Sequence, residues 1–145
     1  MVNMEVSIVI NRPVDEVFAS LSDLEKNVKW RSGTVEAQQI STGPIGVGTT
    51  YRMVNSVFGR RLEGEAEVTE LEPNRRFVTK TRSGYSIEAE RIFEAVEGGT
   101  RVTFVVNADL AGFFQLAEPL VAGMGKRRLE SDVADLKDLI ESGVL

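Results

Sequence analysis

The longest helical pattern of the chain lies in its last third, residues 111–142, and it constrains the fold more than any other stretch. A helix of this length runs about 45 Å at roughly 1.5 Å per residue, enough to cross a small domain. Apolar residues recur along it at helical spacing: Phe113, Leu116, Leu120 and Met124, then Leu129, Val133, Leu136 and Ile140. An amphipathic helix must bury its apolar side, so we expect the rest of the chain to form the surface that it packs on.

The apolar spacing of this segment changes once, between Met124 and Leu129, where the step is one residue longer than a continuous stripe requires. Glycines and prolines are the usual causes of sharp bends in helices. We therefore expect a kink or bulge near Gly123 and Gly125, with Pro119 as a second bend.

The N-terminal part of the chain predicts one strand and two short helices. Residues 5–10 alternate in polarity, as a half-buried strand does. Pro13 suits the first position of a helix, and the acidic residues after it suit the positive end of a helix dipole. Ser22 with Glu25 three residues later forms a capping-box pattern, which predicts that the second helix begins there.

Six further strands follow from a change of period to two. Their predicted ranges are 34–40, 48–55, 61–70, 75–82, 85–96 and 100–108, separated by segments rich in turn residues. Short connections make the sheet antiparallel, and a strongly twisted antiparallel sheet curls. We predict one α+β domain over residues 1–145. It is a helix grip, with a curved antiparallel sheet of about seven strands around the long C-terminal helix and two short helices after the first strand.

The composition excludes several kinds of chemistry. The chain has no cysteine and no histidine, so disulfides, zinc–thiolate sites and a Ser-His-Asp triad are ruled out. Its net charge of −5 disfavours nucleic-acid binding. We see no signal peptide and no apolar run of about 18 residues, so we expect a cytoplasmic protein without integral membrane association. No cofactor, metal ligand or catalytic residue is assigned.

Three segments and the C-terminal ending LKDLIE carry a resemblance to a known superfamily. The segments are INRPVDEVFASLSDLEKNVKW (10–30), PIGVGTTYR (44–52) and GGTRVT (98–103). The chain resembles the polyketide cyclase/dehydratase and START-like lipid-transfer proteins, which share the birch-pollen-allergen fold. The resemblance implies the helix-grip fold over nearly the whole chain. It does not select a function, because members include lipid carriers, cyclases, chaperone activators and toxins.

Alternation of the strands places the turns near 56–60 and 83–84 and the connection 108–112 at one end of the sheet. Large apolar residues gather there, namely Val57, Phe58, Phe113 and Phe114. They either cap the core locally or form the entrance to an internal cavity. Strand parity and the helix stripe give the residues expected to contact a ligand in such a cavity: Trp30, Tyr51, Met53, Phe58, Leu62, Phe77, Tyr85, Ile87, Arg91, Phe104, Phe113, Phe114, Leu116, Leu120 and Met124.

Arg91 is the unusual member of this set. Strict alternation places it on the inner face, where an unpaired charge costs several kcal/mol. A ligand carboxylate or phosphate would supply a partner. The alternatives, which we favour at this stage, are a β-bulge that turns Arg91 outward or an internal glutamate.

Three functions fit these observations. The first is a carrier or sensor of a small hydrophobic ligand such as a lipid, fatty acid, sterol or polyketide, and we prefer it. The second is an enzyme resembling polyketide cyclases or dehydratases, which requires a positioned acid or base. The third is an interaction module like the ribosome-association toxins. The sequence determines neither the ligand nor the oligomeric state, and a homodimer is left open.

Overall fold

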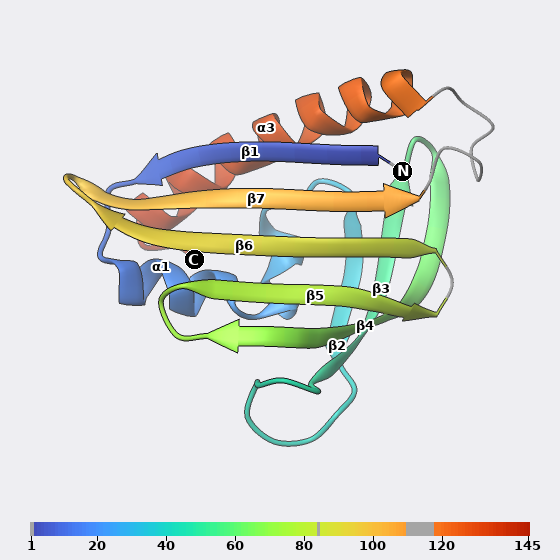
Figure 1. Ribbon diagram of the computed structural model, residues 1–145, viewed down its shortest axis with the longest axis horizontal. Helices are drawn as coiled ribbons and strands as arrows, with labels where there is room; N and C mark the ends of the chain where they lie inside the picture. Colours follow the sequence, from blue (N-terminus) through green and yellow to red (C-terminus); the bar gives the residue numbers. More distant parts are fainter. Residues whose placement is uncertain (1, 84, 110–117) are drawn as a thin grey trace.

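A computed structural model describes residues 2–83, 85–109 and 118–145. Strand β1 (Val2–Ile10) is followed by helix α1 (Val14–Leu21) and the 3-10 helix η1 (Leu24–Lys29). The strands that come next are β2 (Thr34–Gln39), β3 (Thr50–Val57), β4 (Arg60–Glu72), β5 (Arg76–Ser83), β6 (Ser86–Val96) and β7 (Gly99–Asp109). Helix α3 (Glu118–Glu141) follows them (Figure 1).

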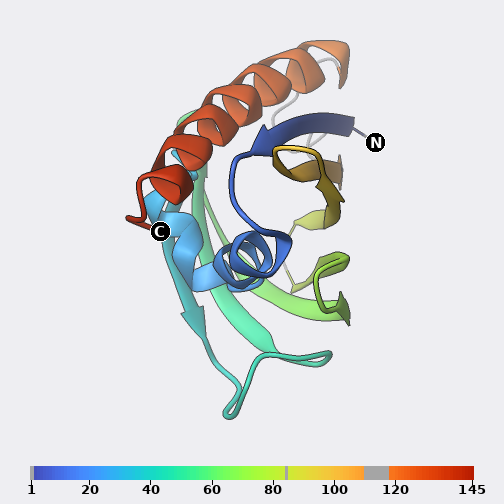
Figure 2. The same ribbon diagram turned by 90° about the vertical axis from the view of Figure 1, so that its left-hand side faces the viewer.

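The strands of the described chain form one seven-stranded sheet in the order β1-β7-β6-β5-β4-β3-β2. Each neighbouring pair is antiparallel, and β1 closes onto β7. Figure 2 shows that the sheet is strongly curved, with α1 inside the curve and α3 lying along β1. The predicted α+β helix-grip fold is therefore confirmed.

The main core lies between the concave face of the sheet and the helices. Buried side chains of α1, the sheet and α3 meet in it, among them Leu21, Tyr51, Phe77, Val133 and Leu136. Fully burying one large apolar side chain contributes about 1.5–3 kcal/mol. The contacts of this cluster hold α3 against the sheet.

The short helices differ slightly from their prediction. Pro13 is the N-cap of α1 and not its first helical residue. Ser22 is the C-cap of α1, so the predicted capping box at Ser22 is wrong. The N-cap of η1 is Asp23, whose carboxylate accepts a hydrogen bond from the backbone N–H of Glu25 at 3.0 Å. Aspartate is as good an N-cap as serine, and here it lies closer to the helix that it caps.

Helix α3 runs without interruption through Gly123 and Gly125, so the predicted bulge is absent. Its inward stripe is Val121, Gly125, Leu129 and Val133, at regular four-residue steps, and all but the half-buried Gly125 are buried. Leu120 and Met124, which the sequence placed on this stripe, are 53% and 37% exposed. That prediction was wrong because Gly125 occupies an inward position without adding to the apolar pattern. The predicted start of the helix, with Phe113 and Leu116, lies outside the described residues.

The close approach of α3 to β1 explains the glycine in this stripe. A Cβ atom on Gly125 would lie 2.6 Å from the sulfur of Met4, closer than real Cβ contacts. A larger residue would therefore force the end of the Met4 side chain to move. The glycine that interrupts the apolar pattern of α3 lets Met4 pack directly against the helix.

The inner face of the sheet follows the predicted alternation, with one exception. Alternation along the predicted strand 34–40 places Val35 on the inner face with Ala37, which packs against the core. Val35 is instead 54% exposed, because the pairing of β2 with β3 shifts register between Thr34 and Glu36. Such a bulge moves the residue within it to the other face. On the outer face, Arg82 pairs with Glu67 at 3.2 Å and Arg76 with Glu70 at 3.1 Å, as expected for a solvated face.

Candidate ligand-binding cavity

A cavity of about 190 Å³ lies between the concave face of the sheet and the helices η1 and α3. Each strand of the described sheet contributes to its wall, and so does the segment from η1 to β2. Helix α3 contributes Val121, Gly125, Arg128 and Leu129. The hollow exists partly because several wall positions carry small side chains, which leave the space between sheet and helix unfilled: Ala66, Ala89, Ala108, Gly33 and Gly125.

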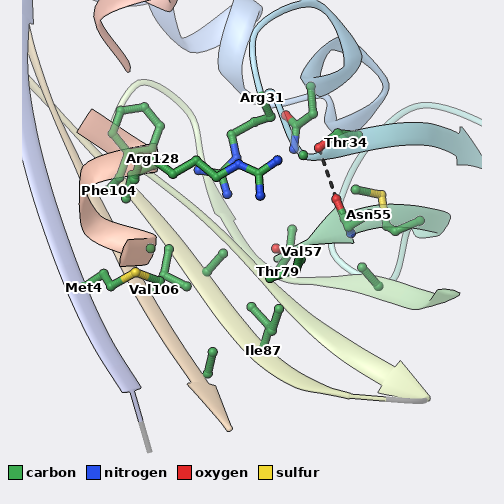
Figure 3. Close-up of a pocket in the computed structure, with 18 of the residues that line it drawn as sticks. Met4, Arg31, Thr34, Asn55, Val57, Thr79, Ile87, Phe104, Val106 and Arg128 are labelled. Atoms are coloured by element: carbon green, nitrogen blue, oxygen red, sulfur yellow. Dashed lines mark hydrogen bonds between the residues drawn. The ribbon is translucent and has the colours of Figure 1, made fainter. Parts of the chain in front are cut away.

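Much of the wall is apolar. Met4, Val106 and Ile87 lie together on one side of Figure 3, and Phe104 stands nearer the helices. At the tip of the β3–β4 hairpin, Phe58 lines the cavity and packs against a cluster formed by Val2 and Val121. The hairpin tip, β1 and α3 therefore meet at one end of the cavity.

Arg91 lies on the wall, 6% exposed, and β6 pairs with β7 without a register shift around it. It donates hydrogen bonds to the carbonyl oxygen of Leu21 at 2.8 Å and to Oδ1 of Asn27 at 3.0 Å. Its guanidinium carbon lies 5.3 Å from the centre of the Trp30 ring. The bulge and the internal glutamate that the sequence favoured are both wrong, because neutral acceptors and aromatic rings surround this charge.

The pKa of Arg91 is lowered to about 9, chiefly because burial removes water from the charged group. The positive charge of Arg31 lowers it further, and Tyr51 opposes the shift. Arg91 and Arg31 also share a neighbour, since the guanidinium carbon of Arg31 lies 5.8 Å from the centre of the same Trp30 ring. Two cations thus lie beside one indole.

A third arginine, Arg128 of α3, completes this group, and its Nε donates to the Ser32 hydroxyl at 3.0 Å. Figure 3 shows Arg31 and Arg128 directed into the cavity. The pKa of Arg31 is lowered by desolvation and by Arg128, and raised by Asp132. Asp132 is 3% exposed, and its Oδ2 lies 3.8 Å from Arg31 Nε. We call Arg31, Arg91 and Arg128 the arginine cluster.

A chain of polar groups lies on another part of the wall. The hydroxyl of Thr34 donates to Oδ1 of Asn55 at 3.2 Å, the contact dashed in Figure 3. The amide of Asn55 donates to the Tyr85 hydroxyl at 2.9 Å. A tyrosine phenol is protonated at neutral pH, and burial raises the pKa of Tyr85 above its ordinary value of 10.0. Because this oxygen accepts from Asn55, its own proton can be donated elsewhere.

The structure brings several of the residues predicted from the sequence to this cavity. Trp30, Met53, Phe58, Tyr85, Ile87, Arg91 and Phe104 line it. Tyr51, Leu62 and Phe77 are buried on the same face of the sheet but are not part of the wall, because other core side chains cover them. Leu120 and Met124 are exposed on α3, on the wrong side of the helix for contact. Phe113, Phe114 and Leu116 lie outside the described residues.

Three wall residues with charged side chains were missed by the sequence reasoning: Arg31, Glu90 and Arg128. Glu90 lies between the inward positions Ala89 and Arg91, so alternation places it on the outer face. Arg128 follows from the stripe of α3 once Gly125 is included, because it lies three residues further on and beside Leu129. Arg31 had no comparable signal, since it lies in the turn between η1 and β2.

The described ranges contain no group of three or more acidic residues placed to hold a metal ion. None of the described helices is long and apolar enough to cross a membrane.

These features define a class of protein: a curved sheet and a long helix that enclose a small, largely apolar cavity with a cationic patch. The sequence model of the family described as polyketide cyclase/dehydrase and lipid transport matches residues 1–141. The chain belongs to this family. Among curated proteins, none matches it.

Solved structures with a similar fold include three from bacteria. A protein from Thermus thermophilus superposes with a TM-score of 0.80 at 18% identity, covering 99% of both chains. A START superfamily protein from Mycobacterium smegmatis gives 0.80 at 14% identity, covering 97% of both. The Zhui aromatase/cyclase from a Streptomyces species gives 0.68 at 14% identity, covering 98% of this chain and 92% of that one. At these identities the likeness establishes the fold.

Proposed function

We propose that this protein binds and carries a small hydrophobic ligand in the cavity between the sheet and α3, without transforming it. The observation that supports this most is the cavity itself, about 190 Å³ with a largely apolar wall beside the buried core. Pockets of this kind, with a few polar groups, are the usual sites for small molecules.

The volume sets the size of the ligand. An engineered apolar cavity of about 150 Å³ in another protein accepts benzene. A single ring or a short alkyl chain therefore fits the space as it stands. A ligand that buries roughly 300 Å² of apolar surface gains about 7 kcal/mol. Association costs of about 4–15 kcal/mol offset much of this, so micromolar or weaker affinity is expected from apolar contact alone.

Trp30 offers a direct test, because it is the only tryptophan in the chain and it lines the cavity. Delipidated protein is titrated with an apolar dye, and with medium-chain alcohols and acids, while Trp30 fluorescence is recorded. A saturable change at one ligand per chain supports the proposal. An absence of any saturable response, together with no bound molecule in native mass spectrometry, would rule it out.

Two isoleucines of β6 provide a matched pair of variants for this titration. Ile87 lines the cavity, and Ile92 is on the outer face of the same strand. Ile87→Phe fills part of the cavity and should weaken dye binding at least tenfold, since the added ring occupies the ligand's space. Ile92→Phe adds the same atoms outside and should leave binding unchanged. Equal effects of the two variants would place the dye elsewhere.

A cyclase-like activity is the second candidate, and the Tyr85 hydroxyl is the observation in its favour. A protonated phenol can donate to a ketone oxygen, and the arginine cluster can stabilise an enolate. In an intramolecular aldol condensation a carbon–carbon bond forms and water leaves. Incubation with a short poly-β-ketothioester, followed by mass spectrometry, tests this. Loss of one water, abolished in Tyr85→Phe, would favour the enzyme over the carrier.

A further inference from the structure

We infer that the ligand is an amphiphile with an anionic head group, held by Arg31 and Arg128, and an apolar tail directed toward Met4, Ile87 and Val106. This inference rests on the proposed ligand-binding function and names the chemical class of its ligand. Either a carboxylate or a phosphate provides the negative charge that the arginines recognise.

The charge on the cavity wall has the opposite sign to that of the protein. The chain carries a net charge of −5, yet three arginines line this one small cavity. Among the described wall residues the acidic one is Glu90, and its carboxylate is paired with Arg76. Asp132 neutralises part of the cluster from behind Arg31. The remaining positive charge lies in a partly enclosed space, where electrostatic attraction is stronger than in bulk water.

The three arginines are not equally available to a ligand. Arg91 already donates to Leu21 and Asn27 and is held against aromatic rings. Arg128 uses its Nε on Ser32. Its Nη2 would lie 2.9 Å from a Cβ atom on Gly33, so the absence of a side chain there makes room for this guanidinium. A guanidinium has five N–H groups, and most of those on Arg128 are not used by these contacts.

Arg31 is the second available group. Its contact with Asp132 is 3.8 Å long, beyond hydrogen-bond distance. Arg31 and Arg128 repel each other electrostatically, and Arg31 also repels Arg91. Holding like charges together costs free energy, which an anion placed between them would reduce. An uncharged ligand would leave that repulsion in place.

The apolar side of the cavity fixes the other end of the ligand. In Figure 3, Met4, Val106 and Ile87 lie apart from the guanidinium groups of Arg31 and Arg128. A head group at the arginines therefore leaves the tail against these side chains. The volume of about 190 Å³ accommodates one ring or a chain of roughly eight carbons, by comparison with cavities that accept benzene.

Isothermal titration calorimetry with octanoate, octyl phosphate and octan-1-ol tests the inference, because the three share a tail and differ in the head. We expect both anions to bind at least tenfold more tightly than the alcohol. The ranking of the two anions then identifies the head group as carboxylate or phosphate. Equal affinity for octanoate and octan-1-ol would overturn the inference but not the carrier function. No binding of any of the three, or of the apolar dye, would overturn the carrier function itself.

Variants of Arg128 and Arg31 test whether the arginine cluster causes the preference for an anionic head group. Arg128→Gln should weaken octanoate binding about tenfold and leave octan-1-ol within twofold. Arg127→Gln is the matched control, because Arg127 is adjacent in sequence and exposed to solvent. Removing Arg31 alone would leave the Asp132 carboxylate buried without its partner. The double variant Arg31→Gln/Asp132→Asn removes both charges, and it should also lower the preference for the anion. An unchanged preference in both the Arg128 variant and the double variant would refute the inference.

Discussion

A guanidinium inside a protein has to replace the water that it loses, and Arg91 does so with neutral groups. The Leu21 carbonyl ends α1, and the Asn27 side chain comes from η1. Arg91 lies on β6, so one side chain joins the sheet to both short helices. Its charge also adds to the field in the cavity. A single residue thus acts on the stability of the fold and on the electrostatics of the site.

The first prediction concerns the contribution of Arg91 to the stability of the fold. Arg91→Met should lower the free energy of unfolding by about 1–3 kcal/mol, because the Leu21 carbonyl and Asn27 Oδ1 lose their donor in a buried place. Urea denaturation measures the change. Arg75→Met is the control, since the Arg75 side chain is 80% exposed, and it should be neutral. If Arg91→Met were as stable as the parent, the two hydrogen bonds would only offset the cost of burying the charge.

Among the larger elements, the β3–β4 hairpin ends in an unusual turn. Phe58 has φ of 49° and Gly59 has φ of 80°. Left-handed backbone is unfavourable for a residue with a side chain such as phenylalanine and costs about 1–2 kcal/mol. Phe58 adopts it while packing at the end of the cavity, against the cluster of Val2 and Val121. The strained turn therefore coincides with the place where the hairpin meets α3 and β1.

The second prediction tests Phe58 as a barrier to ligand exchange. Asparagine tolerates this backbone conformation, so Phe58→Asn should relieve strain while removing the ring. We expect a net stability change within about 1 kcal/mol. Ligand dissociation, followed by stopped-flow Trp30 fluorescence, should be severalfold faster. The control Val47→Asn changes an exposed residue in the β2–β3 loop. Equal exchange rates in the parent and Phe58→Asn would show that ligands pass elsewhere.

The other end of the molecule is held by the last turn of α3. The carboxylate of Glu141 accepts from the backbone N–H of Asn11 at 2.8 Å and from Lys137. Lys137 also donates to the Val9 carbonyl at 2.8 Å, and Arg12 donates to the Glu141 carbonyl. The end of β1 is thus linked to the end of the helix. These hydrogen bonds lower the pKa of Glu141, that from Asn11 most.

The third prediction follows from this lowered pKa. A carboxylate whose folded-state pKa lies below its unfolded value stabilises the fold above pH 4.5, and the effect is lost as the pH falls through the folded-state pKa. Glu141→Gln should be less stable than the parent by about 1 kcal/mol or less at pH 7, because the pair is partly exposed to solvent, which weakens the interaction. The difference should vanish in acid. Glu130→Gln removes the same charge at an exposed position of α3 and is the matched control; a parallel profile for both variants would contradict the assignment.

On the scale of the whole molecule, most of the fold could be predicted from local sequence patterns. The strands were predictable because alternation persists over many residues, as in β4 and β6. Two local irregularities misled the prediction. A bulge turned Val35 outward, and Gly125 interrupted the apolar stripe of α3. Neither feature can be predicted from its own segment of sequence, because each depends on the strand that packs beside it.

The cavity was harder to predict than the sheet. Wall residues on strands, such as Met53, Ile87 and Phe104, follow from parity alone. Tyr51 and Phe77 share that parity but are covered by the core. Whether an inward side chain meets a void or a neighbour depends on how α3 crosses the sheet. Arg31 reaches the cavity from the turn between η1 and β2, and Arg128 reaches it from the edge of the inward stripe of α3. Only the folded structure brings these two side chains together.

The last prediction concerns the balance between the cavity and stability. An empty cavity destabilises the folded state, by about 24 cal/mol per Å³ in another protein. A side chain that fills the cavity should therefore stabilise the ligand-free protein. Ala89→Leu, at the cavity wall, should raise the free energy of unfolding of the ligand-free protein by about 1–2 kcal/mol. The added side chain occupies the ligand's space, so it should also abolish the stabilisation that octanoate gives the parent. At a hundredfold excess over Kd that stabilisation amounts to about 2.7 kcal/mol.

Thermal unfolding of the parent, Ala89→Leu and Ala95→Leu, each with and without octanoate, checks both effects together. Ala95 is exposed near the end of the same strand, so the same substitution there should leave the cavity and its ligand unaffected. An Ala89→Leu protein that is more stable than the parent, and that octanoate no longer stabilises, would show that the fold sacrifices packing to keep a cavity for the ligand. If Ala89→Leu responded like the parent, the ligand would have to lie outside the cavity. If it were destabilised by about 1–3 kcal/mol, as overpacking is, the side chains around Ala89 would leave no room for a guest there.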